Sequence, residues 1–547
     1  MKLNKLSLFQ NWLSFEKSPM FFLYLFLYCF YESFSFSTGV WNYFHGILIT
    51  TFTIFVLVLE LFLKHKQKKN DYINTSFRLA LWTLYIIVIG YQEVYQTALT
   101  FDIVIYFFKH LSLLYADFFS FIYQWKLKQW VVLGFGFYLV ICNTRKQILI
   151  SLLFGILLIL SISFYSEWKV SNAHQYKMVS HQVKRGKTVL ESVSGKPNFV
   201  FVLLEGVSRK QLSSLQSRYI DFSILGGSHF WIPMPHTSKS LFTWMTGESQ
   251  LNHSRLQLDD SLMNLSLPIQ LQKRHNYRTF MIYTQSIYFE GMDRFFPNIF
   301  QSVFDKTYLE KQFGSLYSSF SWGMDDHVVL SALKQINDTN NLPLFVLIGL
   351  SQTHSPYFVS NESNNHQWKS PLLRYEASLK EEIEVLDSII TYWKENSNRE
   401  TVLILSADHG ESFGEEGAHA HNYSLYNQET DVPFLLYFIK SGQVYQPKQG
   451  TSVDFKETML SLLDTNNIQK EYHQKTNFFR SNYEPNLVLK TWNSEIQKSL
   501  ITKDKKYIYH SDRDQLLQMD LMDGNRNSIT DVRVKQKIMN QIYSGIR

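Results

Sequence analysis

Asp408 and His409 stand side by side just after a short apolar run, Val402–Leu405, and His421 follows them beyond a glycine-rich turn. Carboxylate oxygens and imidazole nitrogens are common ligands of divalent metals such as zinc and manganese. An Asp-His pair can also simply cap a turn. The pattern therefore suggests a metal site, a hypothesis that requires further ligands elsewhere in the chain.

Two more polar residues follow apolar runs in the same way. Glu205 comes directly after Phe199–Leu204, and His354 comes shortly after Leu344–Leu350. The carboxyl ends of parallel strands meet at one edge of a sheet, where sites in such folds form. We expect Glu205, His354, Asp408 and His409 to meet at this edge.

A hydroxyl group at a helix start could supply a nucleophile. Pro235 precedes two hydroxyl residues, Thr237 and Ser238. Apolar residues follow at helical spacing, at Leu241, Trp244 and Met245, and they indicate a helix that begins at one of these two hydroxyl residues. The free N–H groups of a helix N-terminus favour a bound phosphate or sulfate. The alternative is that the hydroxyl is only an N-cap.

The elements that must position these residues alternate between strand and helix. We predict strands at Phe199–Leu204, Arg278–Tyr283, Leu344–Leu350, Val402–Leu405 and Pro433–Phe438, and a helix at Tyr375–Trp393. Short apolar strands that alternate with helices are typical of a mainly parallel sheet covered by helices on both faces. The fold class expected for residues 197–547 is therefore α/β.

The first 165 residues have a different composition. Apolar runs of nearly membrane-spanning length lie at about 20–36, 45–63, 79–96, 129–143 and 147–165. A further run at 103–124 is interrupted by charged residues, which suits a helix in the membrane interface better than a crossing. We predict a transmembrane helical domain of about five spans at 1–165 and a juxtamembrane linker at 166–196.

Charge indicates which way such a domain would face. With the N-terminus inside, the inner loops carry most of the basic residues, including Lys64, Lys66, Lys68 and Lys69, and the outer loops carry only Lys109, Lys126 and Lys128. By the positive-inside rule, this distribution predicts a multi-pass protein of the cell membrane whose residues 197–547 lie on the extracytoplasmic side. The net charge of +6 forms no long basic patch with exposed aromatic residues, so we expect no nucleic-acid partner.

The cysteine count limits the chemistry of the second domain. The two cysteines, Cys29 and Cys142, both lie in the apolar region. Residues 197–547 can therefore form neither a disulfide nor a cysteine-bound zinc site.

Together, Glu205, the segment HTSKS at 236–240, His354, SADHG at 406–410 and His421 resemble the alkaline phosphatase superfamily. The resemblance is to its sulfatase-like, membrane-anchored branch of lipoteichoic acid synthases, phosphoglycerol transferases and phosphoethanolamine transferases. It implies that Thr237 is the nucleophile and a metal ligand, together with the ligands Glu205, Asp408 and His409. It implies substrate contacts at His354, His421 and Ser240, with His419 as a competitor for the role of His421.

The same resemblance implies one divalent metal, Mn²⁺ or Zn²⁺, a phospholipid donor, and a glycan or polymer of the cell envelope as acceptor. The head group, phosphoglycerol or phosphoethanolamine, would pass through a phospho-threonine. A sulfatase-like phosphodiester or sulfuric ester hydrolase is the alternative, although no C/S-x-P-x-R segment of formylglycine sulfatases occurs in the sequence. A catalytically inactive membrane sensor or transporter is a third possibility.

Overall fold

The computed structural model describes residues 187–545 except 253–255, 321, 337–340, 361–369, 465–475, 492–496 and 512. The chain divides into two units, at Met1–Tyr176 and Lys177–Arg547, and all described residues belong to the second. The predicted spans and most of the linker lie outside the described part. Within that part, no helix combines the length and apolar character that a membrane crossing requires.

A seven-stranded sheet forms the centre of the described unit, with the strand order β10-β9-β6-β1-β5-β3-β4. The five strands from β6 to β4 are parallel, whereas β9 and β10 run antiparallel to their neighbours. In that order, the strands are Gln443–Tyr445, Phe434–Phe438, Thr401–Ala407, Asn198–Leu204, Leu344–Gly349, Arg278–Tyr283 and Ser302–Phe304. The predicted α/β class with a mainly parallel sheet is confirmed.

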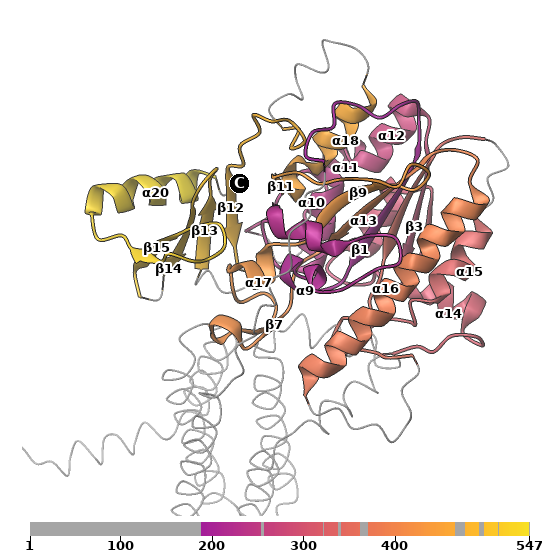
Figure 1. The fold of residues 1–547 in the computed structure, drawn as a ribbon, viewed down its shortest axis with the longest axis horizontal. Helices are drawn as coiled ribbons and strands as arrows, with labels where there is room; N and C mark the ends of the chain where they lie inside the picture. Colours follow the sequence, from indigo (N-terminus) through magenta and orange to yellow (C-terminus); the bar gives the residue numbers. More distant parts are fainter. Residues whose placement is uncertain are drawn as a thin grey trace, which may run out of the picture. The chain divides into compact units, whose positions relative to one another are not determined.

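Helices cover both faces of this sheet (Figure 1). The connections from β1 to β3 and from β3 to β4 cross the sheet in one direction, and those from β4 to β5 and from β5 to β6 cross it in the other. Because such crossovers are right-handed, the two sets of helices lie on opposite faces. The first set comprises α10 (Thr237–Thr246), α11 (Asp260–Asn264), α12 (Leu267–His275) and α13 (Met292–Ile299); the second comprises α14 (Lys306–Phe313), α15 (Val328–Gln335) and α16 (Pro371–Asn396).

This covering explains the composition of the central strands. Every residue of β1, β5 and β6 is buried, as expected for strands that face helices on both sides. The long helix α16 begins at Ser370, whose side chain accepts a hydrogen bond from the Leu373 main chain, with Pro371 in the first turn. Its buried stripe includes Tyr375, Leu379, Ile383, Leu386 and Ile390.

Short elements complete the framework around the main sheet. They are α9 (Arg209–Ser213), the 3₁₀ helices η2 (Phe222–Gly227), η3 (Glu415–Gly417) and η4 (Ser452–Asp454), α17 (Asn427–Thr430), α18 (Phe455–Leu463), the strand pair β2 (His229–Trp231) and β11 (Gln449–Thr451), and the hairpin β7 (Ser412–Phe413) and β8 (His419–Ala420). The hairpin lies between His409 and His421.

A second, antiparallel sheet lies beside the first and carries α20 (Val532–Ser544) (Figure 1). Its strands are β12 (Leu487–Lys490), β13 (Gln497–Ile501), β14 (Lys506–His510), β15 (Gln515–Met519) and β16 (Asn527–Ser528). An apolar cluster joins it to the main unit, where Trp231, Leu425 and Tyr426 pack with buried residues of β12 to β15.

Polar contacts strengthen this junction. The main-chain N–H of Leu425 donates to Gln497 Oε1 at 2.9 Å, and the buried Lys506 donates to Asn427 Oδ1 at 2.7 Å. Lys506 also pairs with Asp523 at 2.8 Å. The second sheet therefore holds the segment that follows His421.

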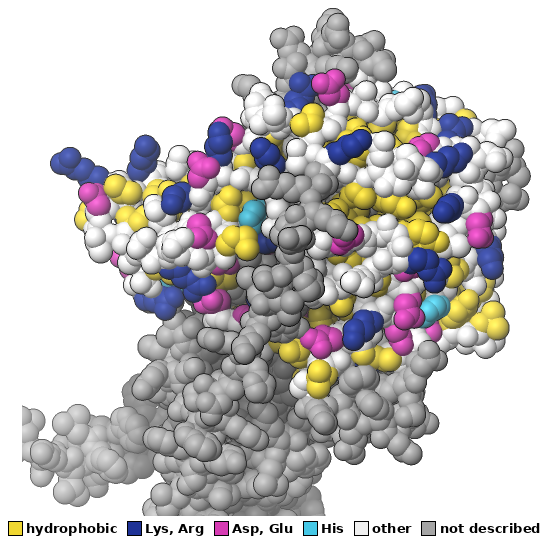
Figure 2. Space-filling model, viewed as in Figure 1, with side chains coloured by type: hydrophobic (Ala, Val, Ile, Leu, Met, Phe, Trp, Pro, Cys, Tyr) yellow, Lys and Arg dark blue, Asp and Glu magenta, His cyan; other side chains and the backbone are white. Residues whose placement is uncertain are grey.

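Charges are mixed on the surface. On the face shown in Figure 2, lysine and arginine side chains are interspersed with aspartate and glutamate. No single basic stripe crosses the described residues visible there.

Candidate active site

Three strand ends place the predicted site residues together. In the parallel register, Leu204 of β1 lies opposite Ala407 of β6, and Leu203 lies opposite Gly349 of β5. The residues that follow, Glu205 and Asp408, therefore leave the sheet as neighbours. The Gly206 main-chain N–H donates to Asp408 Oδ1 at 3.0 Å and holds the two strand ends together.

Thr237 completes a tight cluster with Glu205 and His409. Its hydroxyl donates to Glu205 Oε1 at 3.1 Å and lies 3.1 Å from His409 Nε2. His409 Nε2 is in turn 3.5 Å from Glu205 Oε1 and 3.3 Å from Asp408 Oδ2. The structure thus brings together the four side chains that the resemblance implied as metal ligands.

The start of α10 explains the position of the hydroxyl. The helix begins at Thr237 itself, with His236 as an extended N-cap residue whose side chain makes no capping hydrogen bond. Leu241, Trp244 and Met245 are buried in the core, as their spacing predicted. Thr237 is partly exposed at the helix N-terminus, so its hydroxyl is accessible beside free main-chain N–H groups.

Burial makes the cluster electrostatically costly. It raises the pKa of Glu205 well above its usual range, and the neighbouring Asp408 raises it further. Burial likewise raises the pKa of Asp408 and lowers that of His409 well below its usual range. Asp408 Oδ2 is buried without a hydrogen-bond partner in the described part of the chain.

These properties fit a divalent cation. The ligand atoms of Glu205, Asp408 and His409 all lie within 4.8 Å of one another. A cation would satisfy Asp408 Oδ2 and offset two buried carboxylates, and the low pKa of His409 keeps its imidazole available as a ligand. The residues therefore form a candidate metal site.

His421 and His354 lie on the open side of this cluster. The rings of His409 and His421 are 4.0 Å apart between centroids, and those of His421 and His354 are 6.3 Å apart. Trp322 lies against His354 at 5.5 Å. His354 and His421 are partly exposed, so both can meet a bound substrate.

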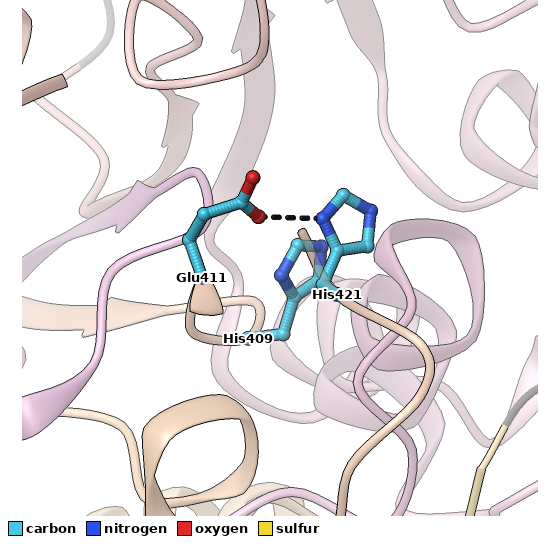
Figure 3. A group of neighbouring side chains, drawn as sticks. All are labelled: His409, Glu411 and His421. Carbon is cyan, nitrogen blue, oxygen red and sulfur yellow. Dashed lines mark hydrogen bonds and ion pairs between the residues drawn. The ribbon is translucent and has the colours of Figure 1, made fainter. Parts of the chain in front are cut away.

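Glu411 orients His421, and it was not among the site residues predicted from the sequence. Its Oε2 lies 2.7 Å from His421 Nδ1 (Figure 3), and its Oε1 accepts a hydrogen bond from the Tyr357 hydroxyl at 2.8 Å. His409, Glu411 and His421 also form a second group whose ligand atoms lie within 4.8 Å of one another. A carboxylate two positions after the Asp-His pair was the available signal.

Ser240 has a different place from the one expected. It is fully buried, and its hydroxyl donates to the main-chain oxygen of Asp408 at 2.5 Å. The hydroxyl hydrogen therefore supports a ligand residue from behind and does not face the substrate side. The His419 main chain lies in β8, and its side chain is outside the description.

Two further supports hold Glu205, and sequence reasoning missed both. Gln285 Nε2 donates to Glu205 Oε2 at 3.0 Å. Thr353 Oγ1 lies 2.5 Å from the main-chain oxygen of Glu205 and 2.7 Å from Oε1 of the fully buried Glu382 on α16. Gln285 follows a predicted strand by two positions, which was its only signal.

Comparison with known protein families gives a match for part of the chain. Residues 197–465 match the family model described as Sulfatase. A search of curated protein sequences gives no match.

Solved structures with some similarity to this chain include a protein of the alkaline phosphatase superfamily from Vibrio parahaemolyticus. The identity is 16% and the TM-score 0.47, with 66% of this chain and 87% of that chain covered. The lipoteichoic acid synthase LtaP from Listeria monocytogenes follows at 14% identity and a TM-score of 0.46, with 64% and 90% covered. The periplasmic domain of EptC from Escherichia coli gives 15% identity and a TM-score of 0.41, with 56% and 93% covered.

The family match starts one residue before β1 and extends past the Asp-His pair, so it contains the whole cluster of Glu205, Thr237, Asp408 and His409. It confirms the resemblance drawn from the sequence. Residues 197–465 therefore form a domain that matches the sulfatase family.

Proposed function

We propose that the protein is a metal-dependent transferase that moves a phospholipid head group, phosphoglycerol or phosphoethanolamine, to a glycan or polymer of the cell envelope. The observation that carries the proposal is the position of the Thr237 hydroxyl, 3.1 Å from both Glu205 Oε1 and His409 Nε2 at the start of α10. A hydroxyl placed against metal ligands is the arrangement of an activated nucleophile. The predicted spans would keep this site beside lipid head groups on the extracytoplasmic side.

In the first step, Thr237 Oγ1 attacks the phosphorus of the donor lipid. A bond from Oγ1 to phosphorus forms, and the bond from phosphorus to the diacylglycerol oxygen breaks. The proton lost from Thr237 ends on that oxygen, so diacylglycerol departs and the head-group phosphate remains as an ester of Thr237, a phospho-threonine. The N-terminus of α10 and the His354 and His421 side chains face the charge on the phosphoryl oxygens. A bound metal would lower the pKa of the Thr237 hydroxyl and offset negative charge.

In the second step, an acceptor hydroxyl attacks the same phosphorus and releases Thr237. The hydroxyl proton of the acceptor replaces the one that Thr237 lost, so the enzyme returns to its starting state. His354 and His421 are the described imidazoles placed to move a proton at the substrate oxygens. Glu411 holds His421 through Nδ1, which leaves Nε2 for this task.

The spacing of the ligand atoms supports a four-coordinate ion, and hence zinc over manganese. The four donor–donor distances given above lie between 3.1 and 3.5 Å. Ligand atoms around a tetrahedral zinc with bonds of about 2.0–2.1 Å lie about 3.3 Å apart. Manganese favours six oxygen-rich ligands, more than these four side chains supply.

Hydrolysis is the second candidate, because the family match is to sulfatases. Water would then replace the acceptor in the second step. The segment HTSKS lacks the cysteine or serine motif of formylglycine sulfatases, so Thr237 would remain the nucleophile.

The test uses the full-length protein in detergent with phosphatidylglycerol or phosphatidylethanolamine, followed by intact-mass spectrometry. The wild type and Thr237→Ser should gain the mass of one head-group phosphate, and Thr237→Ala should gain none and lose turnover. The mass identifies the donor. Full activity of Thr237→Ala would refute the mechanism, and ester hydrolysis without any lipid adduct would favour the hydrolase.

A further inference from the structure

The two carboxylate oxygens of Glu205 have different surroundings. Oε1 faces the ligand cluster, where Thr237 Oγ1 lies at 3.1 Å and His409 Nε2 at 3.5 Å. Oε2 accepts a hydrogen bond from Gln285 Nε2 at 3.0 Å. One oxygen is therefore presented to the metal position, and a neutral amide holds the other.

The amide of Gln285 is itself fixed in this orientation. The Tyr283 hydroxyl donates to Gln285 Oε1 at 3.1 Å, so the amide oxygen faces Tyr283 and the nitrogen faces Glu205. The main-chain oxygen of Gln285 accepts a hydrogen bond from Lys306 at 3.0 Å, and the side chain is 6% exposed. Gln285 thus has little freedom to release Glu205.

The position of the Tyr283 ring depends on the sheet register. Tyr283 lies opposite Gly349, and a Cβ at position 349 would come within 2.3 Å of the ring. The ring occupies the space that a glycine leaves in β5. A line of contacts consequently runs from the sheet through Tyr283 and Gln285 to Glu205.

We propose that Gln285 is a positioning residue that restricts Glu205 to coordination through Oε1 alone, and thereby sets the preference of the site for a four-coordinate ion such as zinc. This inference rests on the proposed metal site. A carboxylate with both oxygens free can bind a cation through both and raise the coordination number, which favours larger ions with oxygen-rich shells. The hydrogen bond from Gln285 opposes that second contact.

The experiment measures metal binding directly. The full-length protein in detergent is stripped of metal and titrated with Zn²⁺ or Mn²⁺ against a chromophoric chelator. Gln285→Met keeps the side-chain length and removes the donor, and it should lower zinc affinity about tenfold, as is common for loss of an outer partner of a ligand. Manganese affinity should fall less, so the ratio of the two affinities should change.

The matched control is Gln446→Met. Gln446 is also a buried glutamine, and its amide donates to the main-chain oxygen of Ile224 at 2.9 Å. Its loss should leave the zinc-to-manganese ratio unchanged. X-ray absorption of the zinc-loaded proteins should show four ligand atoms in the wild type and a fifth in Gln285→Met.

Wild-type affinities for both ions in a folded Gln285→Met protein would overturn the inference while leaving the proposed transferase intact. If that variant does not fold, Tyr283→Phe decides, because it removes only the hydroxyl that orients the amide. A lower zinc-to-manganese ratio in Tyr283→Phe supports the inference, and an unchanged ratio overturns it. A wild type that binds neither ion refutes the metal site and the inference together.

Discussion

Glu411 illustrates how a buried carboxylate can control a neighbouring histidine, here His421. Burial alone would lower the pKa of His421, and the Glu411 carboxylate reverses this and raises it. The same contact holds Nδ1 of His421 against Glu411, and it thereby fixes the direction in which Nε2 points. His421 therefore depends on Glu411 both for its orientation and for its ability to hold a proton.

We predict that Glu411→Gln lowers kcat/KM about 10²-fold, the lower end of what general acid–base catalysis by a positioned side chain contributes. Steady-state kinetics with the lipid donor would measure the change, with thermal unfolding as a check on folding. Tyr357→Phe is the matched control, since it removes the other hydrogen bond to Glu411 and keeps the charge beside His421. A Glu411→Gln enzyme as fast as the wild type would show that His421 needs no carboxylate.

At the scale of single residues, the sequence predicted the candidate metal ligands better than the residues that hold those ligands in place. Glu205, Asp408 and His409 follow apolar strands directly, so their common edge could be inferred. Gln285 and Glu382 could not be found in this way, because their roles depend on side chains from distant elements meeting in three dimensions. Ser240 shows the converse, since the family resemblance implied a substrate contact and the helix turns its hydroxyl toward the Asp408 main chain.

Among the elements, Asp431 fixes β2, the strand that precedes helix α10. Its carboxylate pairs with Arg209 of α9 and with His229 of β2, each at 2.8 Å, and accepts the Phe230 main-chain N–H at 3.1 Å. Burial alone would raise the pKa of Asp431, but Arg209 and His229 outweigh it and hold the pKa at about 2. Asp431 thus joins α9 to the strand that precedes Thr237.

This pairing has a predictable pH dependence. Because the pKa of Asp431 is about 2 in the fold and about 3.9 in an unfolded chain, its stabilisation is complete above pH of about 4 and is lost as the pH falls toward 2. The shift corresponds to about 2–3 kcal/mol at neutral pH. Asp431→Asn should cost about 3 kcal/mol at pH 7, since it also leaves Arg209 buried without its partner.

Unfolding midpoints measured from pH 7 down to pH 2 would test this prediction, with a smaller acid-induced decrease expected in Asp431→Asn. Asp514→Asn is the control, because Asp514 pairs with Lys535 on the exposed surface. Equal pH profiles for Asp431→Asn and the wild type would contradict the prediction.

The positions of the strands could be predicted from the sequence, but the direction of every strand in the sheet could not. All five predicted strands occur close to their expected bounds, since each is a short apolar run between polar segments. β9 runs antiparallel to β6. The long connection between them carries the hairpin and His421 and contains no helical crossover from which a direction could be inferred.

For the molecule as a whole, the buried carboxylates of the candidate metal site would link metal binding to folding. Glu205 and Asp408 are both about 97–98% buried in the fold, and an unfolded chain would hold no such preformed group. A metal that binds only the folded state adds about 2.7 kcal/mol of stability at a concentration one hundred times its Kd.

Chelation should therefore lower the melting temperature of the full-length protein, and added zinc should restore it. Asp408→Asn is the matched variant, because it removes a ligand and should make the melting temperature nearly insensitive to the chelator. Identical melting curves of the wild type with and without chelator would contradict a structural contribution from the metal.

The second sheet changes how the protein can be divided. The family match ends at residue 465, before β12 begins, yet Gln497 and Lys506 hold the segment just after His421. A fragment that ends at residue 465 would keep every proposed metal ligand. It would lose the contacts of Gln497 and Lys506 that hold the segment after His421. The part of the chain that would have to be transferred in a domain exchange is consequently larger than the residues that match the family. Such an exchange would have to include both sheets.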